Sequence, residues 1–225
     1  MADETSPARE AAAAAAADLV EEGMTLGLGS GRALWRVVEL IGERDMDVRA
    51  AVASDVTDER AREAGIEVVE LDGDLTLDLA IDGADEVDPE LRLIKGGGGA
   101  LLREKIVVAA AERFVVVAET SKKAERLGEG FRLPVEVVRF AWRDTQRRVA
   151  KLVSDPHLRE EDGEPFVTDE GHLILDCELA EGSDPDGLDT QLSQVPGVME
   201  HGLFIGMTER ALLGTEDGEV EVLER

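Results

Sequence analysis

Three acidic residues stand together near the middle of this 225-residue chain. Asp82, Asp85 and Glu86 directly follow an apolar run, Leu77 to Ile81, which has the length and the flanking turn residues of a buried strand. The pattern therefore predicts that three carboxylates gather at one strand end. A carboxylate whose pKa is raised by partial burial can act as a general base, so this group is a candidate for proton-transfer chemistry.

A lysine and a glycine-rich turn come next along the chain. Lys95 precedes four consecutive glycines, Gly96 to Gly99, and a strong helix-forming segment, Ala100 to Ala111, with Glu104 in its first turns. Glycines ahead of a helix let the backbone approach a ligand closely, and the helix N-terminus offers N–H groups and partial positive charge to an anion. The lysine can also stabilise a developing oxyanion.

Each of these features has an ordinary structural explanation when it is taken alone. A carboxylate cluster is typical of a solvated turn, four glycines are typical of a flexible loop, and Glu104 beside Arg103 and Lys105 is typical of a surface salt-bridging residue. A flexible loop has no advantage in joining a buried strand to a helix, however. Because the acids, the lysine, the glycines and the glutamate all recur within one short span, the combination favours a site.

A second glycine turn lies near the N-terminus. The expected strand Met24 to Leu28 leads through Gly29, Ser30 and Gly31 into the expected helix Arg32 to Glu43, which is the geometry of a phosphate cradle. A dinucleotide-binding GxGxxG turn would need glycine where Arg32 stands, and a P-loop would need a following Lys-Ser/Thr pair. The turn alone therefore indicates only an anion site.

The elements that must position these residues alternate between strand and helix, which predicts an open, mainly parallel, Rossmann-like sheet. Further strands are expected at Val48 to Ala53, Ile66 to Val69 and Phe114 to Ala118. A helix capped by Ser54 is expected to run to Gly65. In such a fold ligands bind at the carboxyl ends of the strands. The candidate residues at such ends are Ser30, Ser54, Asp82, Asp85 and Lys122.

The order of expected strands and helices changes after Gly130, and the new order predicts a second, smaller ferredoxin-like α+β domain. The expected order is β-α-β-β-α-β, with a strand at Val135 to Arg139, a helix at Trp142 to Val153, a hairpin formed by Phe166 to Thr168 and His172 to Glu178, a helix at Leu188 to Gln194, and a strand at Val198 to Phe204. We expect residues 131–204 to form this domain. Residues 1–130 with 205–225 form the Rossmann-like domain, whose sheet is closed by a hairpin of Ala211 to Gly214 and Val220 to Leu223.

Composition restricts the partners of this chain. The net charge is −27, and the 51 acids are spread along the whole sequence, so nucleic acid and anionic membrane are not expected partners. Arginines outnumber lysines by 19 to 5, and together with the acidity this leads to the hypothesis of adaptation to high salt. One cysteine, Cys177, excludes an intramolecular disulfide. No apolar run approaches the ~20 residues of a membrane span, and the N-terminal residues do not have the charged-then-apolar order of a signal peptide. We expect a cytoplasmic protein.

The histidines do not indicate a metal site. His157, His172 and His201 lie outside the motifs described above, with no metal-ligand spacing between them. Surface or turn positions explain them, and no metal is predicted.

The motifs together resemble a known family. The stretches DGADEVDPELRLIKGGGGALLREKIV and VVAETSKKAERLG are similar to the signature of the A-type ribose-5-phosphate isomerases, and LGLGSGRA resembles the phosphate loop of that family. The likeness runs from the helix before Gly23 to the last strand. The family usually offers small hydroxyl residues at the phosphate turn, and here only Ser30 keeps one, because Arg32 and Ala33 depart from the pattern. An arginine can bind phosphate by charge and two-pronged hydrogen bonding.

The resemblance implies an enzyme that interconverts D-ribose 5-phosphate and D-ribulose 5-phosphate through an enediolate, in the non-oxidative pentose phosphate pathway, without a cofactor. It implies that Glu104 shuttles the proton between C1 and C2, that Asp82 and Asp85 open the ring and position hydroxyl groups, and that Lys95 stabilises the oxyanion. The substrate-binding residues that it implies are Ser30, Gly31, Arg32, Ala33, Asp82, Gly83, Ala84, Asp85, Lys95, Gly96, Gly97, Gly98 and Lys122. It also implies two domains and a homodimer or homotetramer.

Two other classes stay open at this point. A sugar-phosphate-sensing domain of a transcription regulator would have a similar fold without turnover, although it would normally accompany a basic DNA-binding module that this chain lacks. A coenzyme A transferase would use a glutamate as a nucleophile and would need an acyl-CoA pocket and usually a longer chain. The segment from Lys95 onward resembles the isomerase instead.

Overall fold

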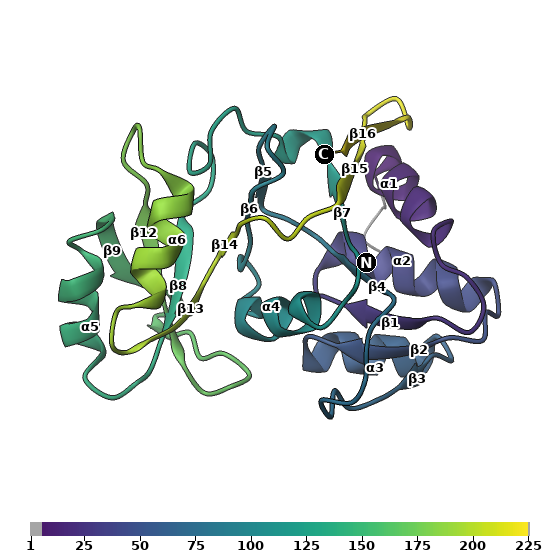
Figure 1. The fold of residues 1–225 in the computed structure, drawn as a ribbon, viewed down its shortest axis with the longest axis horizontal. Helices are drawn as coiled ribbons and strands as arrows, with labels where there is room; N and C mark the ends of the chain where they lie inside the picture. Colours follow the sequence, from purple (N-terminus) through teal and green to yellow (C-terminus); the bar gives the residue numbers. More distant parts are fainter. Residues whose placement is uncertain (1–5, 225) are drawn as a thin grey trace. The chain divides into compact units, whose positions relative to one another are not determined.

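A computed structural model describes residues 6–224 of the chain (Figure 1). These residues form two compact units, and each unit is assembled from separate segments of the sequence. The first unit contains the described chain up to Ala84, Arg103–Lys123 and the chain from Met207 onward. The second contains Asp85–Leu102 and Ala124–Gly206.

The first unit is built on a seven-stranded sheet with the strand order β16-β15-β7-β4-β1-β2-β3. Every neighbouring pair is parallel except β15 and β16, which form the antiparallel closing hairpin. The predicted open, mainly parallel sheet is therefore confirmed. The strands are β1 Thr25–Leu28, β2 Arg49–Val52, β3 Glu67–Val68, β4 Leu79–Asp82, β7 Phe114–Glu119, β15 Arg210–Gly214 and β16 Val220–Glu224.

Helices lie on both faces of this sheet. They are α1 Pro7–Ala17, α2 Arg32–Glu43, α3 Asp55–Glu63 and α4 Leu101–Ala109, and a 3-10 turn, η1, covers Thr120–Lys122. Helix α1 begins as the sequence indicates, because the Ser6 side chain accepts a hydrogen bond from the backbone N–H of Arg9 and Pro7 occupies the first turn. Its alanines allow close packing: a Cβ placed on Gly214 of β15 would lie 1.7 Å from the carbonyl oxygen of Ala8.

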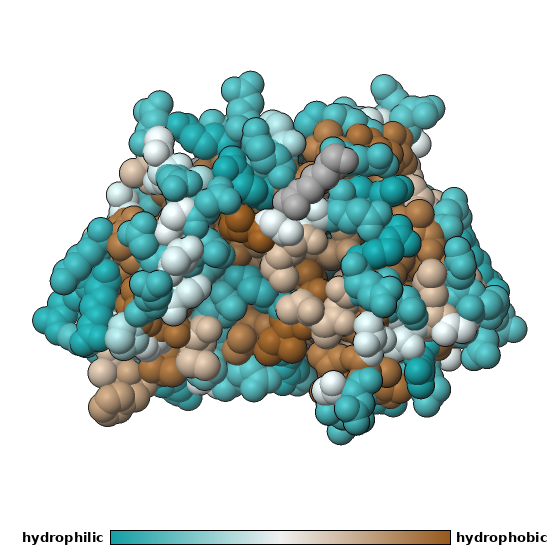
Figure 2. Space-filling model, viewed as in Figure 1, coloured by the Kyte–Doolittle hydropathy of each residue, from teal (hydrophilic) through white to brown (hydrophobic). Residues whose placement is uncertain are grey.

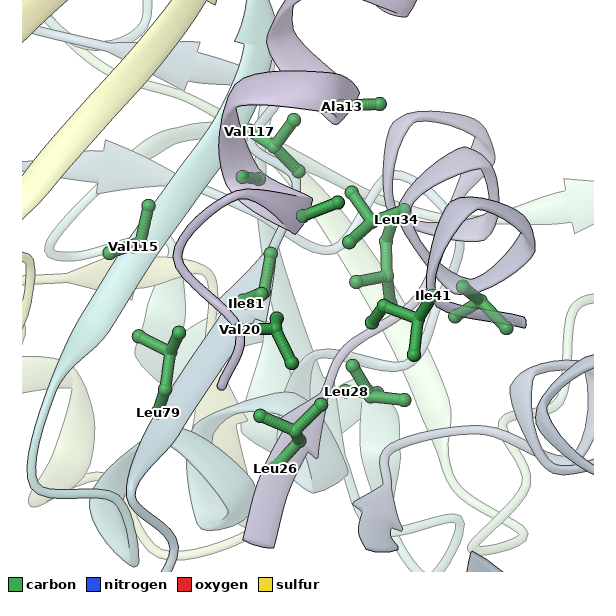
Figure 3. Close-up of a cluster of buried hydrophobic side chains, with 14 of the residues drawn as sticks. Ala13, Val20, Leu26, Leu28, Leu34, Ile41, Leu79, Ile81, Val115 and Val117 are labelled. Carbon is green, nitrogen blue, oxygen red and sulfur yellow. The ribbon is translucent and has the colours of Figure 1, made fainter. Parts of the chain in front are cut away.

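The alternation of side chains along β1 explains how the two faces are covered. Leu26 and Leu28 point into the main core with residues of α1, α2, β4 and β7 (Figure 3). Between them, Gly27 faces the other side, where a Cβ would lie 2.7 Å from the side chain of Val107 in α4. A glycine at this position therefore lets helix α4 pack directly on the sheet.

The second unit contains a four-stranded antiparallel sheet with the order β13-β8-β12-β9, covered by α5 Trp142–Val149 and α6 Pro185–Ser193. The strands are β8 Leu133–Val137, β9 Ser154–Leu158, β12 Leu173–Glu178 and β13 Val198–His201. The chain order is the expected β-α-β-β-α-β. One strand was placed wrongly, because β9 is the partner of β12, whereas of Phe166 to Thr168 only Val167 forms a bridge to Leu173. Strand β9 lies at the sheet edge, where its Pro156 is tolerated.

A small three-stranded sheet completes the second unit and changes the expected domain division. Strands β5 Glu86–Val87 and β6 Leu93–Ile94 form a hairpin, and β6 pairs with β14 Leu203–Phe204. Because of this pairing, residues 85–102 group with the second unit rather than with the Rossmann-like sheet. The strand expected at Val198 to Phe204 is interrupted at Gly202, where a Cβ would lie 2.2 Å from the carbonyl oxygen of Lys95. A further short hairpin joins β10 Glu160–Glu161 and β11 Glu164–Pro165.

The outer surface agrees with the composition. Hydrophilic residues make up most of the face that Figure 2 displays. Within residues 6–224, no helix combines the length and the apolar character that crossing a bilayer requires.

Candidate active site

The first unit gathers several predicted residues where strands β1, β2 and β4 end. The hydroxyl oxygens of Ser30 and Ser54 lie 3.0 Å apart, and Asp82 Oδ1 accepts a hydrogen bond of 3.0 Å from the backbone N–H of Ser30. The Ser54 hydroxyl donates to Thr57 Oγ1, which donates to the carbonyl oxygen of Gly29. Since Ser54 has one hydroxyl proton, Ser30 must be the donor in the contact between the two serines.

Asp82 is held tightly in this arrangement. Its side chain is buried, with 1% of the residue exposed, and Oδ1 also accepts a hydrogen bond of 2.7 Å from the N–H of Gly83. Gly29 lies against it: a Cβ at position 29 would stand 1.8 Å from the carboxyl carbon of Asp82. The first glycine of the phosphate turn is therefore needed to make room for the carboxylate. Sequence reasoning missed this role because the two residues are far apart in the chain.

The phosphate turn itself has the predicted geometry. Gly31 adopts a φ of 107°, which favours glycine, and it caps α2 without any side-chain hydrogen bond. Helix α2 then begins at Arg32, whose side chain is exposed, and continues with the half-buried Ala33. The N-terminus of α2 therefore offers backbone N–H groups at the strand end that also carries Ser30.

Glu104 lies in the first turn of helix α4 and is buried, with 5% of the residue exposed. The alternative of an ordinary exposed salt-bridging glutamate is therefore wrong. The neighbouring Arg103 does make such a contact, with its guanidinium 2.8 Å from the carboxylate of Asp55 at the start of α3. Lys122 ends η1, directly after β7, and is half-buried.

The second unit carries Asp85, Lys95 and the glycines. Asp85 Oδ2 accepts a hydrogen bond of 2.8 Å from the N–H of Gly97, so the carboxylate and the glycine turn are in direct contact. Lys95 is buried, with 2% of the residue exposed, and its ammonium lies 5.5 Å from the ring centre of Phe204. Its backbone N–H donates to the carbonyl oxygen of Gly202, which fixes the strand that leads into the turn.

The glycine turn needs glycine at defined positions. Gly96 and Gly99 adopt φ values of 105° and 84°, and the N–H of Gly99 closes the turn onto the carbonyl oxygen of Gly96 at 3.0 Å. Gly97 and Gly98 are exposed, and no atom would meet a Cβ at position 98 within 4 Å. The turn is therefore an ordered loop with open space beside it.

The third carboxylate of the cluster, that of Glu86, stabilises a loop. Glu86 is buried and accepts hydrogen bonds from the N–H groups of Gly128, Gly130 and Phe131 at 2.6 to 2.8 Å. It holds the loop before β8, so only Asp82 and Asp85 of the three neighbouring carboxylates remain candidates for the site. Asp82 and Asp85 also differ, because the first binds the phosphate turn and the second binds the glycine turn.

These residue types suit proton transfer next to a developing negative charge. Carboxylates supply a base, and an ammonium and backbone N–H groups stabilise an oxyanion. Among residues 6–224, no group of three or more histidine, cysteine or acidic side chains is arranged to hold a metal ion. The histidines contact other groups: His157 contacts Arg132, His172 contacts Glu136, and His201 contacts Ser193.

Comparison with known proteins agrees with this chemistry. The family model of ribose 5-phosphate isomerase A (phosphoriboisomerase A) matches residues 50–218. Ribose-5-phosphate isomerase A of Roseiflexus castenholzii is 50% identical over 220 residues, covering 95% of this chain and 94% of that protein. The protein of the same name from Methanosarcina acetivorans is 43% identical over 227 residues, covering 98% and 95%.

Solved structures of ribose 5-phosphate isomerases are also similar to this chain in fold. Ribose 5-phosphate isomerase A from Methanocaldococcus jannaschii superposes with a TM-score of 0.91 at 34% identity, covering 96% of this chain and 98% of that one. A D-ribose-5-phosphate isomerase in complex with phospho-erythronic acid superposes with a TM-score of 0.92 at 32% identity, covering 96% and 97%. Since both sequence and fold match over nearly the whole length, the resemblance is confirmed, and the chain belongs to the ribose 5-phosphate isomerase A family.

Proposed function

We propose that this chain interconverts D-ribose 5-phosphate and D-ribulose 5-phosphate, an aldose–ketose isomerisation of the non-oxidative pentose phosphate pathway. The observation that carries the proposal is a buried carboxylate, Glu104, in the first turn of a helix that follows a lysine and an ordered glycine turn. The reaction needs a base and an oxyanion site, and these residues offer both. The names of the relatives support the same substrate.

In the proposed mechanism, Glu104 takes the proton from C2 of the open-chain aldose and returns it to C1. The C2–H and O2–H protons leave as the C2 carbonyl forms, while C1 and O1 each receive one. The electrons stay within the substrate, so no redox partner is required. Lys95, together with the N–H groups of the glycine turn, stabilises the enediolate oxygen that carries the charge.

Asp82 and Asp85 share one task in this proposal. Both open the sugar ring and position its hydroxyl groups, and a carboxylate is suited to this because it accepts hydrogen bonds from hydroxyls. Each is already fixed by backbone N–H groups, Asp82 by Ser30 and Gly83 and Asp85 by Gly97. Pre-positioned groups of this kind reduce the reorganisation that the reaction requires. Lys122 makes a further contact with the substrate.

The phosphate is proposed to bind at Ser30, Gly31, Arg32 and Ala33. The supporting observations are the N-terminus of α2, which has no side-chain cap, and the exposed position of Arg32. The Ser30 hydroxyl donates its proton to Ser54 in this structure, so it must turn to donate to a phosphate. Backbone N–H groups at the start of α2 have no rotatable proton to redirect, and together with the charge of the Arg32 guanidinium we assign them the larger share of phosphate binding.

A sugar phosphate is the ligand class that this proposal requires. One relative was solved with phospho-erythronic acid, which supports binding of a phosphorylated sugar derivative here as well. We further propose a cytoplasmic homodimer or homotetramer that uses no cofactor and binds neither nucleic acid nor membranes. The net charge of −27 supports the last point and also the proposed adaptation to high salt.

The test is turnover by the purified protein in molar salt with a chelator present. Formation of ribulose 5-phosphate from ribose 5-phosphate is the expected result. Saturable binding of ribose 5-phosphate by the folded protein without turnover would instead establish the sugar-phosphate-sensing alternative. The assay separates the two because both bind the sugar and only one changes it.

A further inference from the structure

One arginine outside the predicted site contacts the glycine turn directly. Arg159 follows strand β9, and its Nη1 donates to the carbonyl oxygen of Gly96 at 2.8 Å and to that of Gly97 at 3.0 Å. A single guanidinium nitrogen therefore contacts two consecutive peptide groups of the turn.

The contacts of Arg159 with the two carbonyl oxygens also fix the directions of the Gly97 and Gly98 N–H groups. A trans peptide is planar, and its C=O and N–H point in opposite directions; the described chain contains no cis peptide bond. When Arg159 holds the carbonyl oxygen of Gly96, the N–H of Gly97 must point away from the arginine, and it donates to Asp85. In the same way, holding the carbonyl oxygen of Gly97 directs the N–H of Gly98 away from Arg159.

The arginine is itself fixed by two further contacts. Its Nε and Nη2 donate to the two carboxylate oxygens of Asp176 on β12, in a two-pronged ion pair whose side chains are 14% and 16% exposed. Its guanidinium carbon lies 5.8 Å from the ring centre of Phe166, and a Cβ on Gly99 would lie 2.5 Å from that ring. The guanidinium therefore has one orientation, and Gly99 of the turn packs closely against the ring of Phe166.

We propose that Arg159 is a positioning residue for the reaction: by holding the two carbonyl oxygens it keeps the Gly97 N–H on the carboxylate of Asp85 and directs the Gly98 N–H, which stabilises the enediolate. It does not touch the substrate. This inference rests on the proposed function, because the oxyanion is defined by that reaction. A lysine at position 159 would reach one carbonyl oxygen but would lack the planar fork that satisfies Asp176 at the same time.

The test compares Arg159→Lys with a matched control, Arg132→Lys. Arg132 lies in the same unit and also pairs with two acids, Asp155 and Glu178, but these pairs do not involve the glycine turn. Arg159→Lys is expected to lower kcat by about 10- to 100-fold with KM changed less than about threefold, because stabilisation is lost mainly in the transition state. Arg132→Lys is expected to keep kcat within about threefold of wild type.

A second readout does not depend on turnover. Amide hydrogen exchange of the peptide containing Gly97 and Gly98 should accelerate about tenfold or more in Arg159→Lys and remain unchanged in Arg132→Lys. If Arg159→Lys keeps the kcat and the exchange rate of the wild-type protein, the inference is overturned. The proposed function would still stand in that case, because it depends only on turnover by the wild-type protein. If Arg159→Lys does not fold, Asp176→Asn, which releases the guanidinium from its charged partner, is measured in the same way. It should show the same kcat loss in weaker form, and an unchanged kcat and exchange rate would overturn the inference.

Discussion

The contact between Gly29 and Asp82 leads to a sharp prediction for the substitution Gly29→Ala. The added Cβ would lie 1.8 Å from the carboxyl carbon of Asp82 and 2.0 and 2.1 Å from its two oxygens. Carbon atoms in contact are separated by about 3.5 to 4.0 Å, so the carboxylate or the turn must move by about 2 Å. No strained φ is required at position 29, so the substitution tests the steric overlap alone.

A displacement of this size breaks the hydrogen bonds that hold Asp82. The bonds from the N–H groups of Ser30 and Gly83 are 3.0 and 2.7 Å long, and each hydrogen bond to a charged group contributes about 1.5 to 3 kcal/mol. We therefore expect Gly29→Ala to lower the free energy of unfolding by about 3 kcal/mol or more. A misplacement of about 1 Å can reduce a rate about 100-fold, so kcat/KM should fall by at least that factor.

A double-variant cycle provides the control. Unfolding by urea is measured for Gly29→Ala, Asp82→Ala and the combination of the two. Removing the carboxylate opens the space that the new Cβ needs, so Gly29→Ala should cost less than about 1 kcal/mol in the Asp82→Ala background. Additive losses, or a Gly29→Ala variant whose kcat/KM stays within about threefold of wild type, would refute the reasoning.

Three further predictions concern charge and burial. Burial raises the pKa of the Cys177 thiol to about 12, so the native protein should not react with a maleimide at about pH 8 and should react once unfolded; rapid native labelling would contradict the buried position. Burial also raises the pKa of Glu136, against hydrogen bonds from His172 and Thr168 and with Glu170 nearby adding to the rise, so the folded state binds its proton more tightly than the unfolded state. The contribution of Glu136 to stability must then fall as pH increases from the ordinary carboxyl pKa through the raised pKa of the folded state. Over that pH window Glu136→Gln should therefore gain stability relative to wild type. A difference between the urea midpoints of variant and wild type that is the same at both ends of the window would contradict this. Finally, dialysis from molar salt to about 0.1 M should reduce the far-ultraviolet circular dichroism signal, because the repulsion of a −27 chain is then less screened, and a signal independent of salt would refute the proposed adaptation.

Elements with strong local signals could be predicted from the sequence. Helix α2 spans Arg32–Glu43 as expected, because a glycine turn precedes an apolar pattern of helical period. The closing hairpin, β15 and β16, was also located, since its two apolar runs are separated by a turn containing Asp217-Gly218. Both features depend on residues that are close together in the chain.

Features that depend on distant residues could not be predicted in this way. Strand β9 carries Pro156 and exposed side chains, and only its edge position beside β12 makes it a strand. Residues 85–102 join the second unit because β6 pairs with β14, more than 100 residues later.

The candidate site also combines residues with local sequence signals and residues whose contacts are distant in the chain. The motif made Asp82, Asp85, Lys95 and Glu104 candidates, because these residues lie within one short span of the sequence. The contact of Arg159 with the glycine turn joins residues 62 and 63 positions apart, so no local sequence pattern predicts it. Glu86 looked like a third member of the acid cluster, and its hydrogen bonds to the loop at 128–131 explain why it is not.

Glu104 is the residue that we propose moves the proton between C2 and C1. The most direct measurement is turnover of ribose 5-phosphate by Glu104→Gln beside wild type, with circular dichroism to show that both are folded. Glutamine keeps the size of the side chain and removes its basicity. We predict that the variant stays folded and loses most of its kcat, by about 100-fold or more. Turnover within threefold of wild type would contradict the account.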